Sequence, residues 1–503
     1  MTRRWPDRLN IDDHLLRQRL AEGHADRVAL RLDDRDATYS EVDRAASGFA
    51  SLLRDDGVEA GDRVLLVMPD GLQYVAALFG VLRLGAVGLL LNPGLTPGDL
   101  GAIAGLARAK GAVVHASHLD LLEAAVALAG VPMPSLVVVD SDLHLPDVDI
   151  PSFDTAALDP ALWIFSGGTT GLPKAVVQTH RSFANTTELY GKGILELSTE
   201  DVTIAVPKLY FGYAMGSNLF FPFSVGASAV LFEDQSTPDA LFERIARHRA
   251  TVLAHVPSAI NQMLADPDFA VRDMSSLRVA TSAGEALPDT LYRQWTERFG
   301  VELLDGLGTA EMWHIFVSNR VGEVRPGTLG RVVPGFEIEV CDDDGREVPT
   351  GEVGRLWVKG DSLGLGYFEN PGATAEAFRG EWFAGGDLVS IDRDGYVTHR
   401  GRSDDAIKVK GRWFRPQEVE SVLLDHPAVN ECAVVAISDE SGLARPVAFV
   451  VAANVTEAEL TDWALAHLEA YKHPRRIHFV DQLPQTHLGK VDRGALKRLA
   501  EDD

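Results

Sequence analysis

The strongest constraint on the fold is an alternation of short apolar runs and longer helical segments along the N-terminal half of the chain. Residues 63–69, RVLLVMP, are typical of a buried strand, and residues 70–85, DGLQYVAALFGVLRLG, predict a helix that ends at its last glycine. A second strand is expected at 86–92, followed by a helix that begins at Thr96 with Pro97 directly after this N-cap. Such alternation predicts layered α/β sheets whose strands are largely parallel.

The same alternation resumes farther along, and from about Gly327 the pattern changes to short period-two runs separated by Gly, Pro and Asp-Gly turns. The last hundred or so residues combine helices and strands in a block of their own. We therefore predict an α/β protein with a large N-terminal domain over residues 1–402, including a small β unit at about 327–400. A small, mobile C-terminal α+β domain is expected over residues 403–503.

Composition and charge narrow the functional classes. The formal net charge of −26 over 503 residues argues against nucleic acid or an anionic membrane as a partner. The most apolar stretch, VAALFGVLRLGAVGLLLNP, contains Arg83 and several glycines and is too broken to span a bilayer. Cys341 and Cys432 lie far apart and are expected to be reduced thiols, and no signal peptide is expected, so the predicted location is cytoplasmic.

Residues 166–174, SGGTTGLPK, are suited to binding phosphate. The glycines let the backbone turn and expose its N–H groups, the serine and threonines add hydroxyl donors, and Lys174 adds a compact cation. The spacing differs from the GxxxxGK[ST] pattern, because Leu172 and Pro173 separate Gly171 from Lys174. We predict a phosphate-binding loop of another class, and a plain flexible turn is the alternative.

Further segments follow this loop in a fixed order. They are SAGEALP at 282–288, DGLGTAEM at 305–312, FAGGDLV at 383–389, GRSDDAIKVKG at 401–411 and LPQTHLGKVDR at 483–493. In this order the segments resemble the adenylate-forming superfamily, which includes acyl- and aryl-CoA ligases, peptide-synthetase adenylation domains and firefly luciferase. The resemblance extends over nearly the whole chain. It implies that a carboxylic acid is activated by ATP, with release of pyrophosphate, and is then transferred to a thiol.

The resemblance also implies the roles of single residues. Lys490 is expected to bridge the substrate carboxylate and the α-phosphate, and Glu311 is expected to hold Mg²⁺. Because both reactants are anions, electrostatic stabilisation should dominate catalysis. The implied catalytic residues are Lys490, Glu311, Thr309 and Lys174, and the implied nucleotide-binding residues are Ser166, Gly167, Gly168, Thr169, Thr170, Gly171, Lys174, Gly284, Glu285, Ala286, Asp305, Gly306, Asp387 and Arg402.

Thioester formation requires a second arrangement of the two domains. In enzymes that this chain resembles, the small domain swings about a hinge residue that matches Asp404, withdrawing Lys490 from the site. The resemblance implies that Lys410, Gly411 and Arg412 then meet the pantetheine arm of CoA.

Two further segments bear on the acid. PKLYFGYAMGSNLFFPFSVGA at 207–227 and EMWHIFVSN at 311–319 resemble the corresponding segments of benzoate-CoA ligases. An apolar, aromatic slot with one imidazole suits a planar acid. The implied pocket residues are Tyr210, Phe211, Gly212, Tyr213, Gly308, His314 and Ile315.

Two positions depart from the pattern. Gly212 stands where benzoate-CoA ligases tend to carry alanine, which implies a roomier pocket and a substituted or bulkier acid. Ala310 stands where relatives carry a threonine whose hydroxyl meets the α-phosphate. Loss of one charge-assisted hydrogen bond is worth about 1.5–3 kcal/mol, so adenylation is expected to slow unless Thr309 compensates.

We therefore predict an AMP-forming acid–thiol ligase that uses ATP, Mg²⁺ and CoA to convert a benzoate-like acid to its CoA thioester. One alternative is transfer to the phosphopantetheine of an acyl or aryl carrier protein. Another is a weakly adenylating or non-adenylating member that uses a bulkier acid or a preformed acyl-adenylate. The remaining expected partner is a second copy of the chain in a homodimer.

Overall fold

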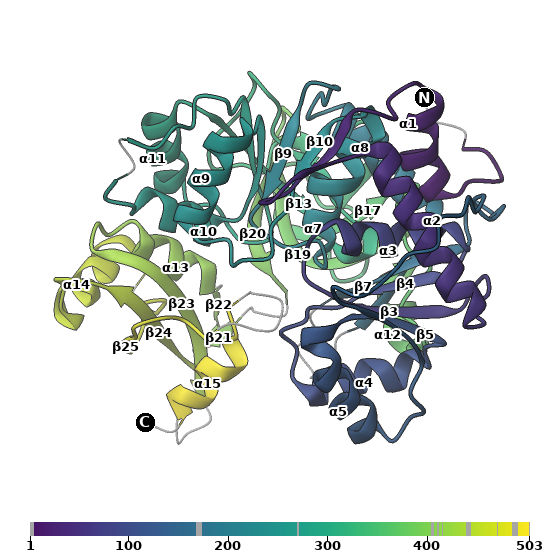
Figure 1. The fold of residues 1–503 in the computed structure, drawn as a ribbon. Coiled ribbons are helices and arrows are strands. Elements are labelled where there is room, and N and C mark those ends of the chain that lie inside the picture. The colour runs from purple at the N-terminus through teal and green to yellow at the C-terminus, as the bar shows by residue number, and fades with distance from the viewer. Residues whose placement is uncertain are drawn as a thin grey trace.

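The computed structural model describes residues 5–166, 174–268, 271–403, 407–409, 412–414, 416–438, 444–469, 471–484 and 491–501. A large N-terminal part carries two wide sheets, and a small C-terminal domain lies beside it (Figure 1). This mixed α/β architecture confirms the predicted fold class. The boundary placed after residue 402 stays a prediction.

The first wide sheet has six strands in the order β6-β5-β3-β4-β7-β8. Neighbouring strands are parallel except for the β7–β8 hairpin, which is antiparallel. The strands are β3 (Arg63–Val67), β4 (Val87–Leu90), β5 (Gly111–His115), β6 (Ser135–Val139), β7 (Pro160–Ser166) and β8 (Lys174–Thr179).

The predicted strand–helix alternation is confirmed around this sheet. Helix α3 (Leu72–Arg83) follows β3, and Gly85 after it adopts a φ of +68°, a value that favours glycine. Helix α4 (Pro97–Ala107) begins as expected, because the Thr96 side chain accepts a hydrogen bond from the backbone N–H of Asp99.

The second wide sheet has nine strands in the order β15-β14-β13-β12-β11-β9-β10-β1-β2. The six central strands, from β13 to β1, are parallel, so their carboxyl ends lie along one edge. The strands are β1 (Val28–Arg31), β2 (Asp36–Thr38), β9 (Val202–Ala205), β10 (Ser228–Val230), β11 (Val252–His255), β12 (Val279–Ser282), β13 (Glu302–Gly308), β14 (Ile315–Ser318) and β15 (Arg331–Val332).

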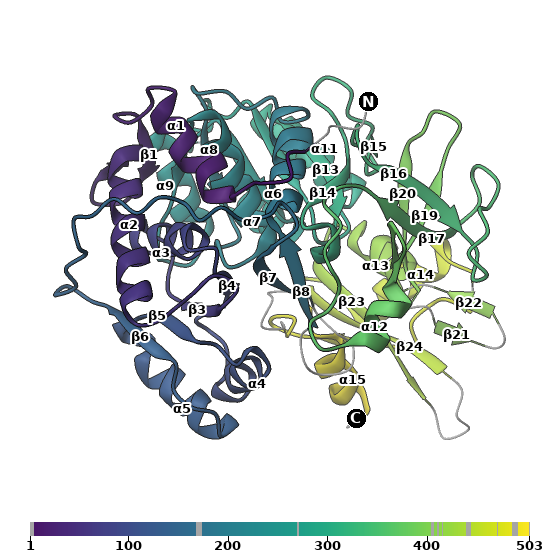
Figure 2. The ribbon, with the colours of Figure 1, turned by 90° about the vertical axis from the view of Figure 1, so that its right-hand side faces the viewer.

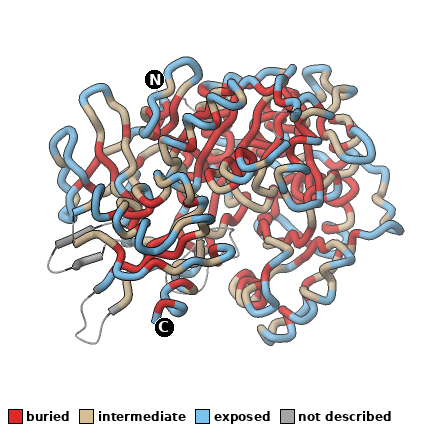
Figure 3. Tube along the Cα trace, turned by 90° about the vertical axis from the view of Figure 1, so that its left-hand side faces the viewer, coloured by how far each residue is buried: buried red, intermediate tan, exposed pale blue. Residues whose placement is uncertain are grey.

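Helices form three layers around the two sheets (Figures 1 and 2). The outer face of the six-stranded sheet is covered by α4 and α5 (Leu119–Ala129). The outer face of the nine-stranded sheet is covered by α9 (Pro238–His248), α10 (Pro257–Leu264) and α11 (Asp289–Phe299). Helices α2 (Tyr39–Asp55), α3 and α8 (Phe221–Val225) pack between the sheets. Figure 3 shows the buried residues gathered in the interior of the molecule and the exposed ones mainly around its periphery.

Short helical segments complete the large part. They are η1 (Asp13–Arg17), α1 (Gln18–Ala21), η2 (Ala116–His118), α6 (His180–Thr186), η3 (Thr187–Lys192), α7 (Gly212–Met215), η4 (Gly216–Phe220), η6 (Ala310–Met312) and α12 (Pro371–Ala377). Across the described ranges, no helix has both the length and the apolar character that a membrane span requires.

A five-stranded sheet and the small domain follow. The sheet contains β16 (Glu337–Cys341), β17 (Gly354–Lys359), β18 (Phe378–Arg379), β19 (Trp382–Ile391) and β20 (Val397–Arg402). The small domain contains β21 (Ile407–Val409), β22 (Arg412–Phe414), α13 (Pro416–Leu424), β23 (Val429–Ser438), β24 (Ala444–Ala452), α14 (Glu457–His467), β25 (Arg476–Phe479) and α15 (Arg493–Glu501).

A buried ion cluster ties the N-terminal segment to the inner helices. Both carboxylate oxygens of Asp12 accept hydrogen bonds from Arg83, at 3.0 and 2.9 Å, and Arg83 also donates to Asp43 at 2.6 Å. The side chains of Arg83 and Asp12 are fully buried. A buried charge that loses its partner is costly, so this cluster strongly constrains the packing of η1 on α3.

We expect Arg83→Met to lower the free energy of unfolding by about 3–5 kcal/mol, because it strands the buried carboxylate of Asp12. Urea unfolding of the ligand-free protein measures the effect. Arg44→Met is the control, since the pair of Arg44 with Asp147 is exposed and should leave the midpoint unchanged. Equal midpoints for the Arg83 variant and the wild type would contradict the role given to the cluster.

Candidate active site

The predicted phosphate loop joins the ends of the β7–β8 hairpin. Ser166, the last residue of β7, stands opposite Lys174, the first residue of β8. The connecting residues Gly167, Gly168, Thr169, Thr170 and Gly171 lie outside the described residues. The hairpin therefore brings the serine and the lysine of the predicted loop to one place at the edge of the six-stranded sheet.

Glu311 lies in the short helix η6, which follows β13 of the other sheet. Thr309 caps this helix, because its hydroxyl oxygen accepts a hydrogen bond from the N–H of Met312 at 3.3 Å. The side-chain amide of Gln178, in β8, donates to the carbonyl oxygens of Ala310 and Glu311 at 2.7 and 3.1 Å. Gln178 thus connects the segment that carries Glu311 to the hairpin that carries Lys174.

The carboxylate of Glu311 is oriented by Tyr367. The Tyr367 hydroxyl donates a hydrogen bond of 2.6 Å to Glu311 Oε1, and only 7% of Glu311 is exposed. The ammonium group of Lys174 lies 5.0 Å from the centre of the Tyr367 ring, within the range of a cation–π contact. Lys174, Tyr367 and Glu311 therefore form a contiguous series of side chains. No motif pointed to Gln178 or Tyr367.

Asp387 and Arg402 lie opposite each other on the antiparallel strands β19 and β20. Arg402 Nη1 lies 3.6 Å from Asp387 Oδ1, and His399 Nε2 lies 3.2 Å from the same oxygen. The structure thus brings together two residues that were assigned to nucleotide binding from separate motifs. His399 is an additional partner that sequence reasoning missed.

Two further segments assigned to nucleotide binding lie after β12 and within the adjacent strand β13. Gly284 has a φ of +90°, and the Glu285 carboxylate accepts hydrogen bonds from the N–H and hydroxyl of Ser258, at 3.0 and 3.2 Å. Asp305 is paired with Ser282 in the strand register, and burial raises the pKa of Asp305 to about 8. Ala286 and Gly306 belong to the same two segments. A small pocket lined by Asp305, Leu287, Tyr292, Leu303, Asn319 and residues 324–328 opens beside them.

The residues assigned to the acid come together from two chain segments. The rings of Tyr213 and His314 pack at a tilt of 36° with their centres 5.1 Å apart, and His314 Nε2 lies 2.9 Å from the carbonyl oxygen of Tyr213. Since a carbonyl only accepts, His314 donates through Nε2, and burial lowers its pKa to about 3, so the ring is neutral. The Tyr213 hydroxyl lies 2.6 Å from the Thr281 hydroxyl.

A second pocket extends this region toward the six-stranded sheet. Tyr210, Phe211 and Gly212 form one wall, and Ile164 and Phe165 from β7 form another. The remaining lining comes from the end of β4 and from α4: Leu90, Leu91, Asn92, Leu95 and Ile103. The motifs gave no sign of this last wall, which lies more than a hundred residues away from Tyr210 in the sequence.

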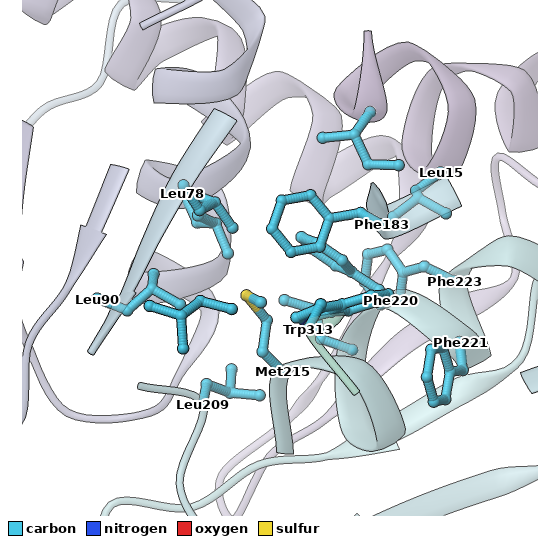
Figure 4. Packing of buried hydrophobic residues seen from close by; sticks show 14 of the residues in the cluster. Leu15, Leu78, Leu90, Phe183, Leu209, Met215, Phe220, Phe221, Phe223 and Trp313 are labelled. Carbon is cyan, nitrogen blue, oxygen red and sulfur yellow. The ribbon is translucent and has the colours of Figure 1, made fainter. Parts of the chain in front are cut away.

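A buried aromatic core supports both pocket segments. Figure 4 shows Trp313 gathered with Phe183, Phe220 and Phe221. The ring centre of Trp313 lies 4.6 Å from that of Phe183, edge to face. Because Trp313 directly precedes His314, this packing fixes the position of the neutral imidazole.

Several predicted residues cannot be placed. Asp404, Lys410, Gly411 and Lys490 lie outside the described residues, and for Arg412 only its position in β22 is described.

The donor set is compatible with Mg²⁺ only with help from a ligand. Across the part of the chain that the structure describes, no group of three or more His, Cys, Asp and Glu side chains forms a ready-made metal site. Mg²⁺ is commonly held by one or two carboxylates together with substrate phosphates and water. The single, oriented carboxylate of Glu311 beside the hairpin that is predicted to bind phosphate fits this mode.

Comparison with known proteins identifies the family. The family model described as AMP-binding enzyme matches residues 17–368, and the model of its C-terminal domain matches residues 418–490. The chain belongs to the AMP-binding enzyme family. Its predicted membership of the adenylate-forming superfamily, close to the benzoate-CoA ligases, is confirmed.

Among curated relatives, the benzoate–CoA ligase of Thauera aromatica is 39% identical, with 98% of this chain and 96% of the relative covered. The 4-hydroxybenzoate–CoA/benzoate–CoA ligase of Rhodopseudomonas palustris is 33% identical, with 95% and 92% covered. Among solved structures, the anthranilate CoA ligase AuaEII in complex with anthranoyl-AMP matches with a TM-score of 0.93 and 36% identity, covering 99% of this chain and 98% of the other.

Two glycines of the site differ in the space around them, which gives a prediction. A Cβ on Gly308 would lie 2.5 Å from the His314 carbonyl oxygen, whereas a Cβ on Gly212 would meet Ile164 at 3.3 Å. We expect Gly308→Ala to cost at least about 1–3 kcal/mol of stability through overpacking, and Gly212→Ala to cost less. Thermal unfolding of both variants measures the difference, and the reverse order would show that the backbone around His314 yields easily.

Proposed function

We propose that this protein is an AMP-forming ligase that activates a benzoate-like aromatic acid with ATP and transfers the acyl group to the thiol of CoA. Similarity to benzoate- and hydroxybenzoate-CoA ligases over nearly the whole chain supports the reaction class. The observation that carries the proposal is the linkage of Glu311 to Lys174 through Gln178 and Tyr367, next to the aromatic pocket.

Different residues would bind the different parts of ATP during adenylation. The Lys174 end of the hairpin would hold the β- and γ-phosphates, and Asp387 with Arg402 would bind the ribose. Mg²⁺ bound at Glu311 would neutralise charge on the phosphates. A carboxylate oxygen of the acid attacks the α-phosphorus, the bond from that phosphorus to the bridging oxygen breaks, and pyrophosphate leaves. The role of Lys490 at the bridging oxygen remains a prediction from the family pattern.

The second half-reaction consumes the acyl-adenylate. The CoA sulfur attacks the acyl carbon, the bond from that carbon to the phosphate oxygen breaks, AMP leaves, and the thiol proton passes to solvent. The hinge at Asp404 and the pantetheine contacts of Lys410, Gly411 and Arg412 stay predictions.

The pocket favours a planar acid with a substituent. The neutral ring of His314 and the ring of Tyr213 offer an aromatic, uncharged surface, and Gly212 brings no side chain into the pocket that it lines with Ile164. Because Thr309 already accepts from the Met312 N–H, its hydroxyl proton can donate to a phosphate oxygen. This supports adenylation by the chain itself despite Ala310.

A substrate panel tests the proposal. Benzoate, hydroxybenzoates, aminobenzoates and alicyclic acids are each incubated with ATP and Mg²⁺, and both pyrophosphate release and acyl-CoA formation are measured. We expect acid-dependent pyrophosphate release, and CoA thioester when CoA is present. Absence of both with every acid would refute the function, whereas turnover of a synthetic acyl-adenylate alone would identify a non-adenylating member.

The same assay separates the acceptors. A holo-carrier protein that outcompetes CoA would favour the carrier-protein alternative. Homodimer formation and a cytoplasmic location also stay predictions, and light scattering tests the first.

We expect Tyr367→Phe to lower the rate of pyrophosphate release on the order of tenfold, because Glu311 loses a charge-assisted hydrogen bond worth about 1.5–3 kcal/mol. The apparent Mg²⁺ requirement should rise as well. Tyr396→Phe serves as control, since Tyr396 stacks on Arg325 between β19 and β20 and does not contact Glu311. An unchanged Mg²⁺ dependence in the Tyr367 variant would contradict the assignment.

Gly212→Ala should shift the selectivity toward unsubstituted benzoate. The added methyl group would lie 3.3 Å from Ile164 and narrow the pocket that both residues line, and one methyl group in an apolar pocket is worth about 1–3 kcal/mol in discrimination. The ratio of kcat/KM for benzoate to kcat/KM for the preferred substituted acid measures the shift. The same ratio in wild type and variant would remove Gly212 from the pocket.

A further inference from the structure

The pocket segment 207–212 runs from β9 to α7 with little regular structure of its own. At its start, the N–H of Val206 donates to the carbonyl of Ala254 at 2.9 Å. The ammonium group of Lys208 donates to the carbonyl of Phe232 at 2.8 Å, and the N–H of Phe211 donates to the carbonyl of Lys208 at 2.9 Å. Leu209, between them, is fully buried, and its side chain packs near Leu90 and Met215 (Figure 4).

The backbone of Leu209 is held from the other sheet. Asp70 lies in the turn between β3 and α3 of the six-stranded sheet, and both of its carboxylate oxygens accept from the N–H of Leu209, at 3.0 and 3.2 Å. Asp70 is only 5% exposed. A buried carboxylate thus binds one backbone N–H of the segment that carries Tyr210, Phe211 and Gly212.

A carboxylate buried at this position carries a desolvation cost. Burial raises the pKa of Asp70 to about 7, against the opposing effects of the nearby Lys208 ammonium and the Leu209 N–H. The other titratable groups that face Asp70 are the phenols of Tyr74 in α3 and Tyr210 in the pocket segment. A well-packed apolar residue would avoid this desolvation, so stability alone does not account for the carboxylate.

We propose that Asp70 is a positioning residue for the acid pocket: its buried carboxylate fixes the backbone of Leu209 and thereby sets the place of Tyr210, Phe211 and Gly212. The inference rests on the proposed function for the identity of the bound acid. It adds a residue outside every motif, on the opposite sheet, to the determinants of acid binding.

Protonation of Asp70 should weaken the hydrogen bond that its carboxylate accepts from the Leu209 N–H. An ionised acceptor forms a stronger hydrogen bond than a neutral one. The affinity of the enzyme for its carboxylic acid substrate should therefore rise as the pH rises through about 7. The contribution of Asp70 to the free energy of unfolding should instead fall as the pH rises. Between the ordinary pKa of 3.8 and about 7 the folded protein holds a proton that the unfolded chain has lost, so the contribution of Asp70 to stability falls across this window.

The test compares Asp70→Asn and Asp70→Leu with the wild type. Asparagine keeps an oxygen acceptor without charge, and leucine removes the acceptor. At pH 8 we expect the KM for the acid to rise about tenfold in the asparagine variant and further in the leucine variant, as for loss of a charge-assisted hydrogen bond, with the KM for ATP unchanged. The rise of kcat/KM for the acid near pH 7 should disappear in Asp70→Asn.

Asp201→Asn is the matched control. Asp201 is equally buried and also accepts from a backbone N–H, that of Ser198 at 2.8 Å, but it precedes β9 at the end remote from the pocket segment. Its loss should lower the unfolding midpoint and leave the KM for the acid unchanged.

Amide hydrogen exchange of residues 208–212 gives a readout that needs no activity. Exchange should be faster in Asp70→Asn than in the wild type and in Asp201→Asn. Unaltered exchange, or an unaltered KM for the acid in an active Asp70→Asn enzyme, would overturn the inference. A wild type that releases no pyrophosphate with any acid would refute the proposed function instead, while the exchange experiment still decides whether Asp70 holds the segment.

Discussion

The candidate site depends on the hydrogen bonds from Gln178 to the carbonyl groups of Ala310 and Glu311. The two wide sheets are built from different parts of the chain, and each contributes half of the site. The β7–β8 hairpin brings Lys174, while the segment after β13 brings Glu311. A side-chain amide with two donors is enough to fix the distance between these halves, because both acceptors belong to one short, capped helix. The hairpin proposed to bind phosphate and the oriented carboxylate are therefore mechanically connected.

Local patterns predicted most of the fold, and shared motifs predicted most of the candidate site. The strand–helix alternation around β3, α3, β4 and α4 needed only apolar periodicity and the Thr96 cap. The residues that sequence reasoning missed share a different property. Gln178 and Tyr367 act through partners far away in the chain, His399 acts through a partner on the neighbouring strand, and nothing in their immediate neighbours marks any of the three. Such pairings are set by the packing of whole sheets, which a local pattern does not contain.

Charge explains why the site is assembled from so many segments. The chain carries a formal net charge of −26 and yet is proposed to bind two anionic reactants. A general attraction to anions is therefore absent, and each negative group must be met by a donor at short range. Lys174, Arg402 and the capped helix η6 belong to separate elements, and η6 is followed directly by Trp313, which packs on the buried ring of Phe183. The aromatic core thus helps to fix the position of η6, which carries Glu311.

The proposed selectivity for the acid then depends on the backbone position of residues 210–212 rather than on a single side chain. The wall at residues 210–212 follows a nine-stranded sheet, but its facing wall, from Ile164 to the end of β4, belongs to the six-stranded sheet. A small relative shift of the sheets would change the width of the pocket without altering any lining residue. Asp70 is placed to oppose such a shift, since it belongs to one sheet and binds the backbone of the segment that follows the other. The missing methyl group at Gly212 widens a pocket only if that backbone stays where it is.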